Sequence, residues 1–271
     1  MERTKVRANH TIRRAGLARA LSKLGYCSRS HAAELIRAGR VSLNGNICRD
    51  PEAPVSGKLH QIAVDEKLVE ARKKIYLMMN KPRGVVTTAF DEEGRETVYT
   101  ILNRDYLNQD YSGKTGSTEK EQAWVAPVGR LDIASEGLLL LTNDSEWGAR
   151  IAAPETHLDK TYHVQIAIVP NEAFIHALVR GVKVKQAVEL LRVKQARPLR
   201  AGKKNCWIEI VLDEGKNRQI RRIMESLSVE VLRLVRVAIG PLQLGDLPRG
   251  QHRSLTATEK QMLDRALQGK T

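Results

Sequence analysis

The chain has 271 residues, of which 42% are hydrophobic, and its 45 Lys and Arg against 31 Asp and Glu give a net charge of +14. This length exceeds one average domain, and the hydrophobic content excludes a wholly disordered chain, so we expect two packed domains. The chain has no run of 18 apolar residues and no apolar segment after its charged start, which argues against a membrane span and a signal peptide. The three cysteines lack CxxC spacing, which indicates a reducing, cytoplasmic location.

The basic excess is concentrated at the start of the chain. Residues 1–50 contain 11 Lys and Arg and only 3 acidic residues. Clustering of this kind predicts a polyanionic partner rather than a charge that serves only solubility. Aromatic residues make up 4% of the chain, which argues against a broad stacking platform for single strands.

The first apolar segment, LARALSKLGYCSRSHAAELIRAGRVSLNG, predicts two helices followed by a hairpin. Its leucines recur at helical spacing up to Gly25, which is expected to end the first helix. Ser30 is the expected N-cap of a second helix over residues 31–38. The Asn44-Gly45 pair predicts a type I′ hairpin turn, because that turn needs two positive φ angles.

This segment resembles the S4-type RNA-binding domain. The resemblance implies contacts with the backbone of folded RNA rather than with bases, as expected for basic side chains on a small rigid fold. The expected RNA contacts are Arg19, Lys23, Arg29, Arg37 and Arg40. Cys27, His31 and Cys48 offer only three candidate zinc ligands without the paired-Cys spacing, so we expect no metal.

Composition also suggests where the domains begin and end. We expect an RNA-binding domain with a basic arm over 1–66, a charged linker over 67–74, a catalytic domain over 75–260 and a tail over 261–271. The segment 103–123 is polar and reads as a surface insertion.

Strands outnumber helices in the second domain. We therefore expect an α+β fold around a mixed, mostly antiparallel sheet. Strands are predicted at 75–79, 85–88, 138–141, 161–168, 206–212 and 229–239, and helices at 171–180 and 217–227.

The segment VGRLDIASEGLLLLTND places Asp132 shortly before four leucines that predict a buried strand. We expect this carboxylate to be buried and therefore paired, because an unpaired buried charge is strongly unfavourable. A helix over 217–227 would carry Arg218, Arg221 and Arg222 on one face, where like charges repel one another and favour an anionic partner. That partner is either RNA phosphate or Asp132, which an arginine would keep ionised.

Other hypotheses account for the same residues. An aspartate before an apolar strand is ordinarily a turn or cap residue, which would fit a non-enzymatic ribosome assembly factor that binds RNA. Glu136, four residues after Asp132, leaves open a nucleic-acid glycosylase with two carboxylates. The sequence has no P-loop, dinucleotide fingerprint or nucleophile elbow.

Five motifs in one order carry a second resemblance: YLMMNKPRGVVTT, VGRLDIASEGLLLLTND, KTYHV, EGKNRQIRRIM and GPLQLGDLPRGQHRSLTATE. Together with the S4-type segment they resemble the Rsu-type pseudouridine synthases that act on bacterial ribosomal RNA. The likeness spans residues 15 to about 260. It departs at Ser135, where many relatives have threonine, but the hydroxyl is retained.

The resemblance implies isomerisation of uridine without cofactor or metal, and it assigns residue roles. Asp132 is the essential carboxylate, acting on C1′ as a nucleophile or removing the 2′ proton to give a glycal. Arg221 is its expected partner, Tyr162 is expected to stack on the uracil and assist loss of the C5 proton, and Arg130 to fill the gap left by the flipped base. Further expected substrate contacts are Lys81, Lys160, Lys216 and Arg218, with a structural role left open for Lys81 and Lys216.

The resemblance also bears on the substrate and the assembly. We expect a monomer that acts on ribosomal RNA, with large-subunit RNA favoured over small-subunit RNA and transfer RNA left open. No membrane association is expected.

Overall fold

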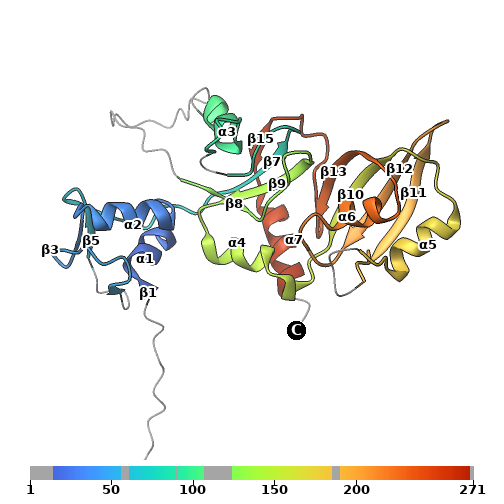
Figure 1. Ribbon diagram of the computed structural model, residues 1–271. Coiled ribbons are helices and arrows are strands. Elements are labelled where there is room, and N and C mark those ends of the chain that lie inside the picture. The colour runs from blue at the N-terminus through green and yellow to red at the C-terminus, as the bar shows by residue number, and fades with distance from the viewer. Residues whose placement is uncertain (1–14, 56–60, 89–90, 107–123, 185–189, 269–271) are drawn as a thin grey trace, which may run out of the picture. The chain divides into compact units, whose positions relative to one another are not determined.

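Figure 1 shows the computed structural model, which describes residues 15–55, 61–88, 91–106, 124–184 and 190–268. The described residues form two compact units. One contains the residues up to Lys74 together with 124–126 and Asn143–Ser145, and the other contains most of the chain from Ile75 onward.

The smaller unit packs two helices against short strands. Leu17, Leu21 and Ile36 are fully buried in its core. One sheet has the order β3-β2-β5-β6, and β1 pairs with β4. The helices are α1 (Leu17–Lys23) and α2 (Arg29–Arg37), and the strands are β1 (Ala15–Gly16), β2 (Val41–Leu43), β3 (Asn46–Ile47), β4 (Pro54–Val55), β5 (Ile62–Val64) and β6 (Lys67–Leu68).

The predicted hairpin of this unit is confirmed, while the predicted N-cap of α2 is wrong. Asn44 and Gly45 join β2 to β3 with φ angles of 54° and 84°, as a type I′ turn requires. Helix α2 is capped by Ser28, whose hydroxyl accepts a hydrogen bond from the His31 amide at 3.1 Å. Ser30 lies inside the helix, because Ser28 is the last residue with extended backbone angles.

The larger unit is built on a nine-stranded sheet with the order β11-β12-β10-β13-β9-β7-β15, to which β14 adds beside β13 and β8 beside β9. Strand β9 runs parallel to β13, whereas the other specified pairings are antiparallel. The predicted mixed, mostly antiparallel α+β fold is confirmed. The strands are β7 (Tyr76–Lys81), β8 (Ala126–Val128), β9 (Glu136–Thr142), β10 (Lys160–Ile166), β11 (Gln195–Ala201), β12 (Cys206–Leu212), β13 (Val231–Ile239), β14 (Leu242–Gln243) and β15 (His252–Ser254).

Helices of the larger unit cover the sheet and make its strands buried. Figure 1 shows α4, α7, α6 and α5 in succession along this unit. Residues of α5 and α6 pack with β10 and β12, and residues of α4 and α7 pack with Leu138 and Leu140 of β9. All four leucines from Leu138 to Leu141 are fully buried, as predicted. The helices are α3 (Val98–Tyr106), α4 (Ser145–Ala152), the 3₁₀ turn η2 (Pro154–Thr156), α5 (Glu172–Arg180), α6 (Gln219–Ser226) and α7 (Ala257–Gln268).

The strand predicted at 85–88 is wrong. The segment forms only an isolated bridge, between Val86 and Thr97. Gly84 and Thr87 instead support the loop before β9: the Gly84 amide donates to the Ile133 carbonyl at 2.7 Å, and the Thr87 hydroxyl donates to the Leu131 carbonyl at 2.8 Å. These bonds fix the loop that carries Asp132.

Two segments differ from the bounds expected for them. Of the polar insertion expected at 103–123, residues 107–123 lie outside the described residues, and α3 extends to Tyr106. The expected tail boundary at residue 260 falls inside α7, and Leu263 of this helix is fully buried in the larger unit. Within the described ranges, no helix is long and apolar enough to cross a bilayer.

Candidate active site

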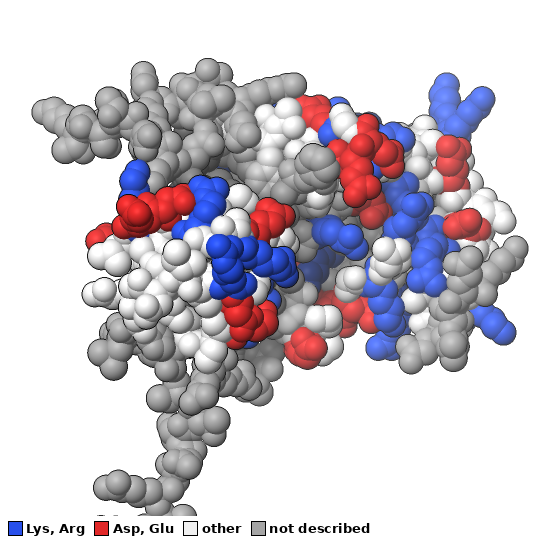
Figure 2. Space-filling view, turned by 60° about the vertical axis from the view of Figure 1, so that its left-hand side comes forward, with Lys and Arg blue, Asp and Glu red and all other residues white. Residues whose placement is uncertain are grey.

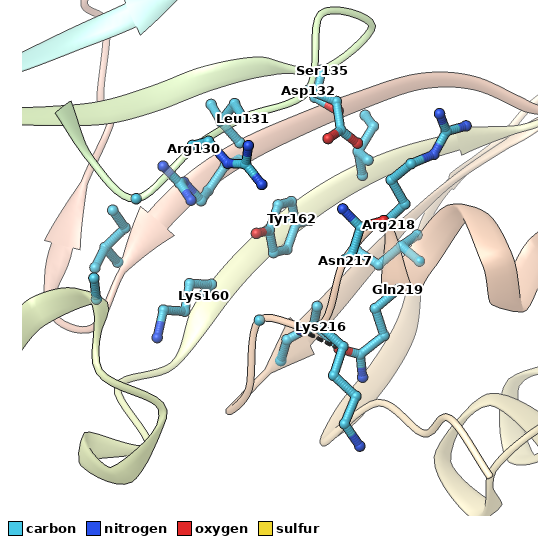
Figure 3. Close-up of a pocket in the computed structure, with 18 of the residues that line it drawn as sticks. Arg130, Leu131, Asp132, Ser135, Lys160, Tyr162, Lys216, Asn217, Arg218 and Gln219 are labelled. Carbon is cyan, nitrogen blue, oxygen red and sulfur yellow. Dashed lines mark hydrogen bonds between the residues drawn. The ribbon is translucent and has the colours of Figure 1, made fainter. Parts of the chain in front are cut away.

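A cavity of about 250 Å³ opens in the larger unit, beside the loop that precedes β9 (Figure 3). The loop over residues 129–135 forms one wall, and the loop over 215–219 before α6 forms another. Strand β10 contributes Lys160 and Tyr162 between them. Six of the residues singled out in the sequence line this one cavity: Arg130, Asp132, Lys160, Tyr162, Lys216 and Arg218.

Asp132 is half-buried, so the prediction of a buried carboxylate is wrong. It sits in a turn in which the Ser135 amide donates to the Asp132 carbonyl at 2.9 Å. Leu131 before it is buried, and a continuous run of buried residues begins at Ser135, which is 2% exposed, and continues into β9. Figure 3 shows the Asp132 carboxylate on the side of the cavity that faces Tyr162. The carboxylate is therefore open to a substrate, while a hydrogen bond holds the backbone that carries it.

Lys81 is fully buried behind the same loop, so its predicted role as a substrate contact is wrong. Its ammonium group donates to three carbonyl oxygens, those of Pro82 at 3.0 Å, Asp132 at 3.2 Å and Ser135 at 2.9 Å. A protonated lysine has three donors and no acceptor, which matches three carbonyls. Lys81 thus fastens the turn that carries Asp132.

Burial lowers the pKa of Lys81 to about 8, although the nearby charges of Asp132 and Glu136 oppose this shift. A neutral amine has one donor fewer than the ammonium form, so one of the three carbonyls then loses its partner. Lys81 is therefore expected to hold the Asp132 turn most firmly below pH 8.

Replacement of Lys81 by Met is expected to slow turnover by about 100-fold, because displacing a reacting group by about 1 Å has effects of that size. Three carbonyls, of which that of Ser135 is buried, would lose a donor. This loss should lower the free energy of unfolding by about 1–3 kcal/mol. Single-turnover rates and urea unfolding measure the two effects. A variant with the wild-type rate would show that the turn is held without Lys81.

Raising the pH gives a second test of Lys81. The rate should fall as pH rises through about 8, where Lys81 loses its proton in the folded protein. The free energy of unfolding should instead rise with pH between about 8 and 10.5, the ordinary pKa of a lysine. In this range the unfolded chain binds the proton that the folded chain has released, so a higher pH favours the folded state. Parallel profiles of rate and of unfolding free energy check this. A rate that is flat between pH 7 and about 9.5 would contradict it.

Arg221 supports the Asp132 loop from behind the cavity. Its Nη2 donates to the Ala134 carbonyl at 2.8 Å. Burial lowers the pKa of Arg221 and the Asp132 charge opposes that shift, so the two groups are within electrostatic reach. Within the described residues, however, no hydrogen bond or ion pair within 4.0 Å joins them, so the expected direct pair is not present.

Arg218 does not share a helix face with Arg221, contrary to the prediction. Helix α6 begins at Gln219, and Arg218 is its N-cap with a left-handed φ of 48°. This conformation ends the preceding loop and leaves Arg218 exposed at the cavity. Left-handed backbone in a non-glycine residue is uncommon and occurs at functional sites.

Glu136 is a structural carboxylate. It is 4% exposed and pairs with Arg233 at 3.0 Å and with Arg249 at 3.0 Å. Burial would raise the pKa of Glu136, but the hydrogen bonds and charge of Arg233, with the charges of Arg249 and Arg83, lower it. A general acid for glycosidic cleavage needs a raised pKa, so this environment speaks against the glycosylase hypothesis.

Arg236 of β13 also lines the cavity and was not singled out from the sequence. It lies opposite Tyr162 in the β10–β13 register and is 6% exposed. In the segment VEVLRLVRVAI it resembles an ordinary polar residue of an alternating strand. Only its pairing with β10 and β9 identifies it as part of the site.

The basic residues of the smaller unit are at its surface. Arg19, Arg29 and Arg37 are exposed and Lys23 is half-buried. Arg40 donates from Nε to Asp65 at 2.8 Å, and this hydrogen bond raises the pKa of Arg40. Figure 2 shows that Lys and Arg side chains gather in groups on the face in view. Because Arg40 is engaged with Asp65, the exposed Arg19, Arg29 and Arg37 are better candidates than Arg40 for phosphate contacts.

The three candidate zinc ligands of this unit do not form a metal site. Burial raises the pKa of Cys27 to about 11, which keeps it a protonated thiol. His31 is exposed and contacts Glu34 at 3.4 Å. Among the described residues, no group of three or more His, Cys, Asp or Glu side chains could hold a metal ion.

Comparison with known proteins adds independent information. Residues 75–226 match the family model of RNA pseudouridylate synthase, and residues 16–59 match that of the S4 domain. The ribosomal large subunit pseudouridine synthase B of Bacillus subtilis is 32% identical over 247 residues, which cover 91% of this chain and 94% of that protein. An uncharacterized RNA pseudouridine synthase of Aquifex aeolicus is 34% identical over 252 residues, covering 91% and 92%. A crystal structure of a pseudouridylate synthase aligns with a TM-score of 0.60 at 26% identity, covering 92% of this chain and 99% of that one.

Proposed function

Since the chain belongs to the RNA pseudouridylate synthase family and converts uridine to pseudouridine in RNA, we propose that its substrate is ribosomal RNA, with a uridine of the large subunit favoured. Support comes from the Bacillus subtilis relative, whose name specifies the large ribosomal subunit, and from the S4 domain. Exposed arginines on this domain suit the shape and backbone of folded RNA. We further propose that the chain acts as a monomer.

The reaction requires the target base to leave its stack, because C1′ is shielded within a helix. Tyr162, half-buried in the cavity wall, would stack on the flipped uracil, and the exposed Arg130 would fill the gap in the RNA. The exposed Lys216 and Arg218, with Lys160, would bind the flanking phosphates. The assignment rests on the observation that Asp132 and Tyr162 line the same cavity. A uracil stacked on Tyr162 would place C1′ near Asp132.

Asp132 would then break the glycosidic bond, either by attacking C1′ or by removing the 2′ proton to give a glycal. The electron pair of the C1′–N1 bond passes to the uracil ring in both routes. The uracil turns, C5 bonds to C1′, the C5 proton is lost with help from Tyr162, and N1 takes up a proton. Arg221 would act as a positioning residue, because it holds the Ala134 carbonyl of the loop that carries Asp132.

The substrate proposal is tested by tritium release from RNA that carries [5-³H]uridine, because the C5 hydrogen is lost in this reaction. Transcripts of large-subunit RNA, small-subunit RNA and transfer RNA are compared with equal enzyme. Release from the large-subunit transcript alone is the expected result. Release from either of the others alone would overturn the choice of RNA, and liberation of free uracil would indicate a glycosylase.

A further inference from the structure

Arg236 is a buried cation without a counter-ion. Its Nε donates to the Leu138 carbonyl at 2.7 Å, while its Nη2 is buried and has no hydrogen-bond partner. Among the described residues, no carboxylate lies within 4.0 Å of its guanidinium group. Buried donors are almost always satisfied, and a buried charge without a partner is strongly unfavourable. An exception of this kind in a cavity wall indicates that a partner arrives with the substrate.

The fold brings Arg236 to the wall of the cavity. It faces Tyr162 across the β10–β13 pairing and Gly137 across the parallel β9–β13 pairing. A Cβ at Gly137 would lie 2.3 Å from the Arg236 carbonyl oxygen, so only glycine allows the two strands to approach this closely. The close approach places Arg236 and the turn that carries Asp132 on walls of one cavity.

We propose that Arg236 is a catalytic residue, whose guanidinium group donates a hydrogen bond to a carbonyl oxygen of the departing uracil. This inference rests on the proposed reaction at Asp132. When the C1′–N1 bond breaks, its electron pair moves into the ring and gives negative charge to N1 and the carbonyl oxygens. A buried donor aimed at developing charge stabilises the transition state more than the ground state. The bond is then released when C5 attacks C1′ and N1 is protonated.

The phosphate groups of the RNA are the other candidate for the anionic partner of Arg236. Phosphate groups of a flipped nucleotide remain near the RNA backbone, at the mouth of the cavity, where Arg130, Lys216 and Arg218 are exposed. Arg236 is 6% exposed and neighbours Tyr162, the residue expected to contact the base. The base is therefore the better match for Arg236.

The test compares two leaving groups in one RNA. The transcript that reacts in the tritium assay is made with uridine or with 5-fluorouridine, whose base carries negative charge more readily. Single-turnover formation of the C-linked product is followed by nuclease digestion and mass spectrometry, because fluorine at C5 leaves no proton to release. Arg236→Met and Arg236→Lys are compared with Leu234→Ala, which alters the same strand and cavity without removing charge.

Arg236→Met should slow the uridine reaction by about 100-fold and the 5-fluorouridine reaction by about 10-fold or less, with RNA affinity unchanged. Arg236→Lys should recover part of the rate, and Leu234→Ala should slow both substrates equally. Equal slowing of both substrates by Arg236→Met would overturn the proposal and indicate a structural role. A weaker affinity with an unchanged rate at saturation would overturn it in favour of a phosphate contact.

Failure of the underlying reaction gives a different result from failure of this inference. If wild-type enzyme forms no C-linked product on any transcript, the proposed function fails. If it forms the product and Arg236→Met treats both bases alike, only the role of Arg236 fails.

Discussion

Replacement of Asp132 by Asn should reduce the rate of pseudouridine formation by at least about 10⁴-fold, the size of loss typical when a reacting group is removed. The amide keeps the shape of the side chain but neither attacks C1′ nor accepts a proton at neutral pH. The turn should survive, because Lys81 and the Ser135 amide hold the carbonyl of residue 132 and not its side chain. Single-turnover tritium release measures the rate.

RNA affinity of the Asp132 variant should stay within about twofold of wild type, because phosphate contacts dominate binding. Filter binding at one fixed salt concentration checks this. Asp246→Asn, in an exposed loop of the same unit, is the matched control and should leave the rate unchanged. A rate within about tenfold of wild type for Asp132→Asn would rule out both routes through this carboxylate.

Neutralising the basic surface of the smaller unit should affect binding and not chemistry. Substitution of Arg19, Lys23, Arg29 and Arg37 by Gln removes four candidate phosphate contacts, each expected to lower the slope of log affinity against log salt by about 1. Affinity at moderate salt should fall by about 100-fold or more, while the rate at saturating RNA stays near wild type. Binding isotherms at several salt concentrations and single-turnover rates give the two quantities.

The control for this variant removes the same charge elsewhere. Four exposed basic residues of the larger unit are changed to Gln: Arg150, Arg180, Lys183 and Arg265. Their loss should reduce affinity far less than loss of the S4-domain residues. Equal effects of the two sets would mean that net charge, and not a defined RNA surface, governs binding.

Local sequence patterns predicted those parts of the fold that depend on neighbouring residues. The leucine run predicted β9 and Asn44-Gly45 predicted the first hairpin, because each signal lies within a few residues. Strand β11 was missed, since QARPLRA contains Pro198 and shows no alternation of buried residues. An edge strand tolerates proline, and its partner β12 determines that it forms.

The sequence predicted several residues that line the site, but not what each of their side chains does. Motif resemblance identified Asp132, Tyr162 and Arg130, which line one cavity. Lys81 was expected to contact the substrate, because no sequence signal shows three carbonyls converging on a buried amine. Arg236 was overlooked because its burial depends on the approach of β9 at Gly137, far away in the sequence.

The central claim, that Asp132 of this chain makes one pseudouridine in ribosomal RNA, is tested most directly by mapping pseudouridine in total RNA from cells with and without the gene. Carbodiimide adducts on pseudouridine block reverse transcriptase and give the position of each modified nucleotide. One block in large-subunit RNA should disappear without the gene, return with the wild-type gene, and stay absent with Asp132→Asn. An unchanged set of blocks, or restoration by the Asp132→Asn gene, would contradict the claim.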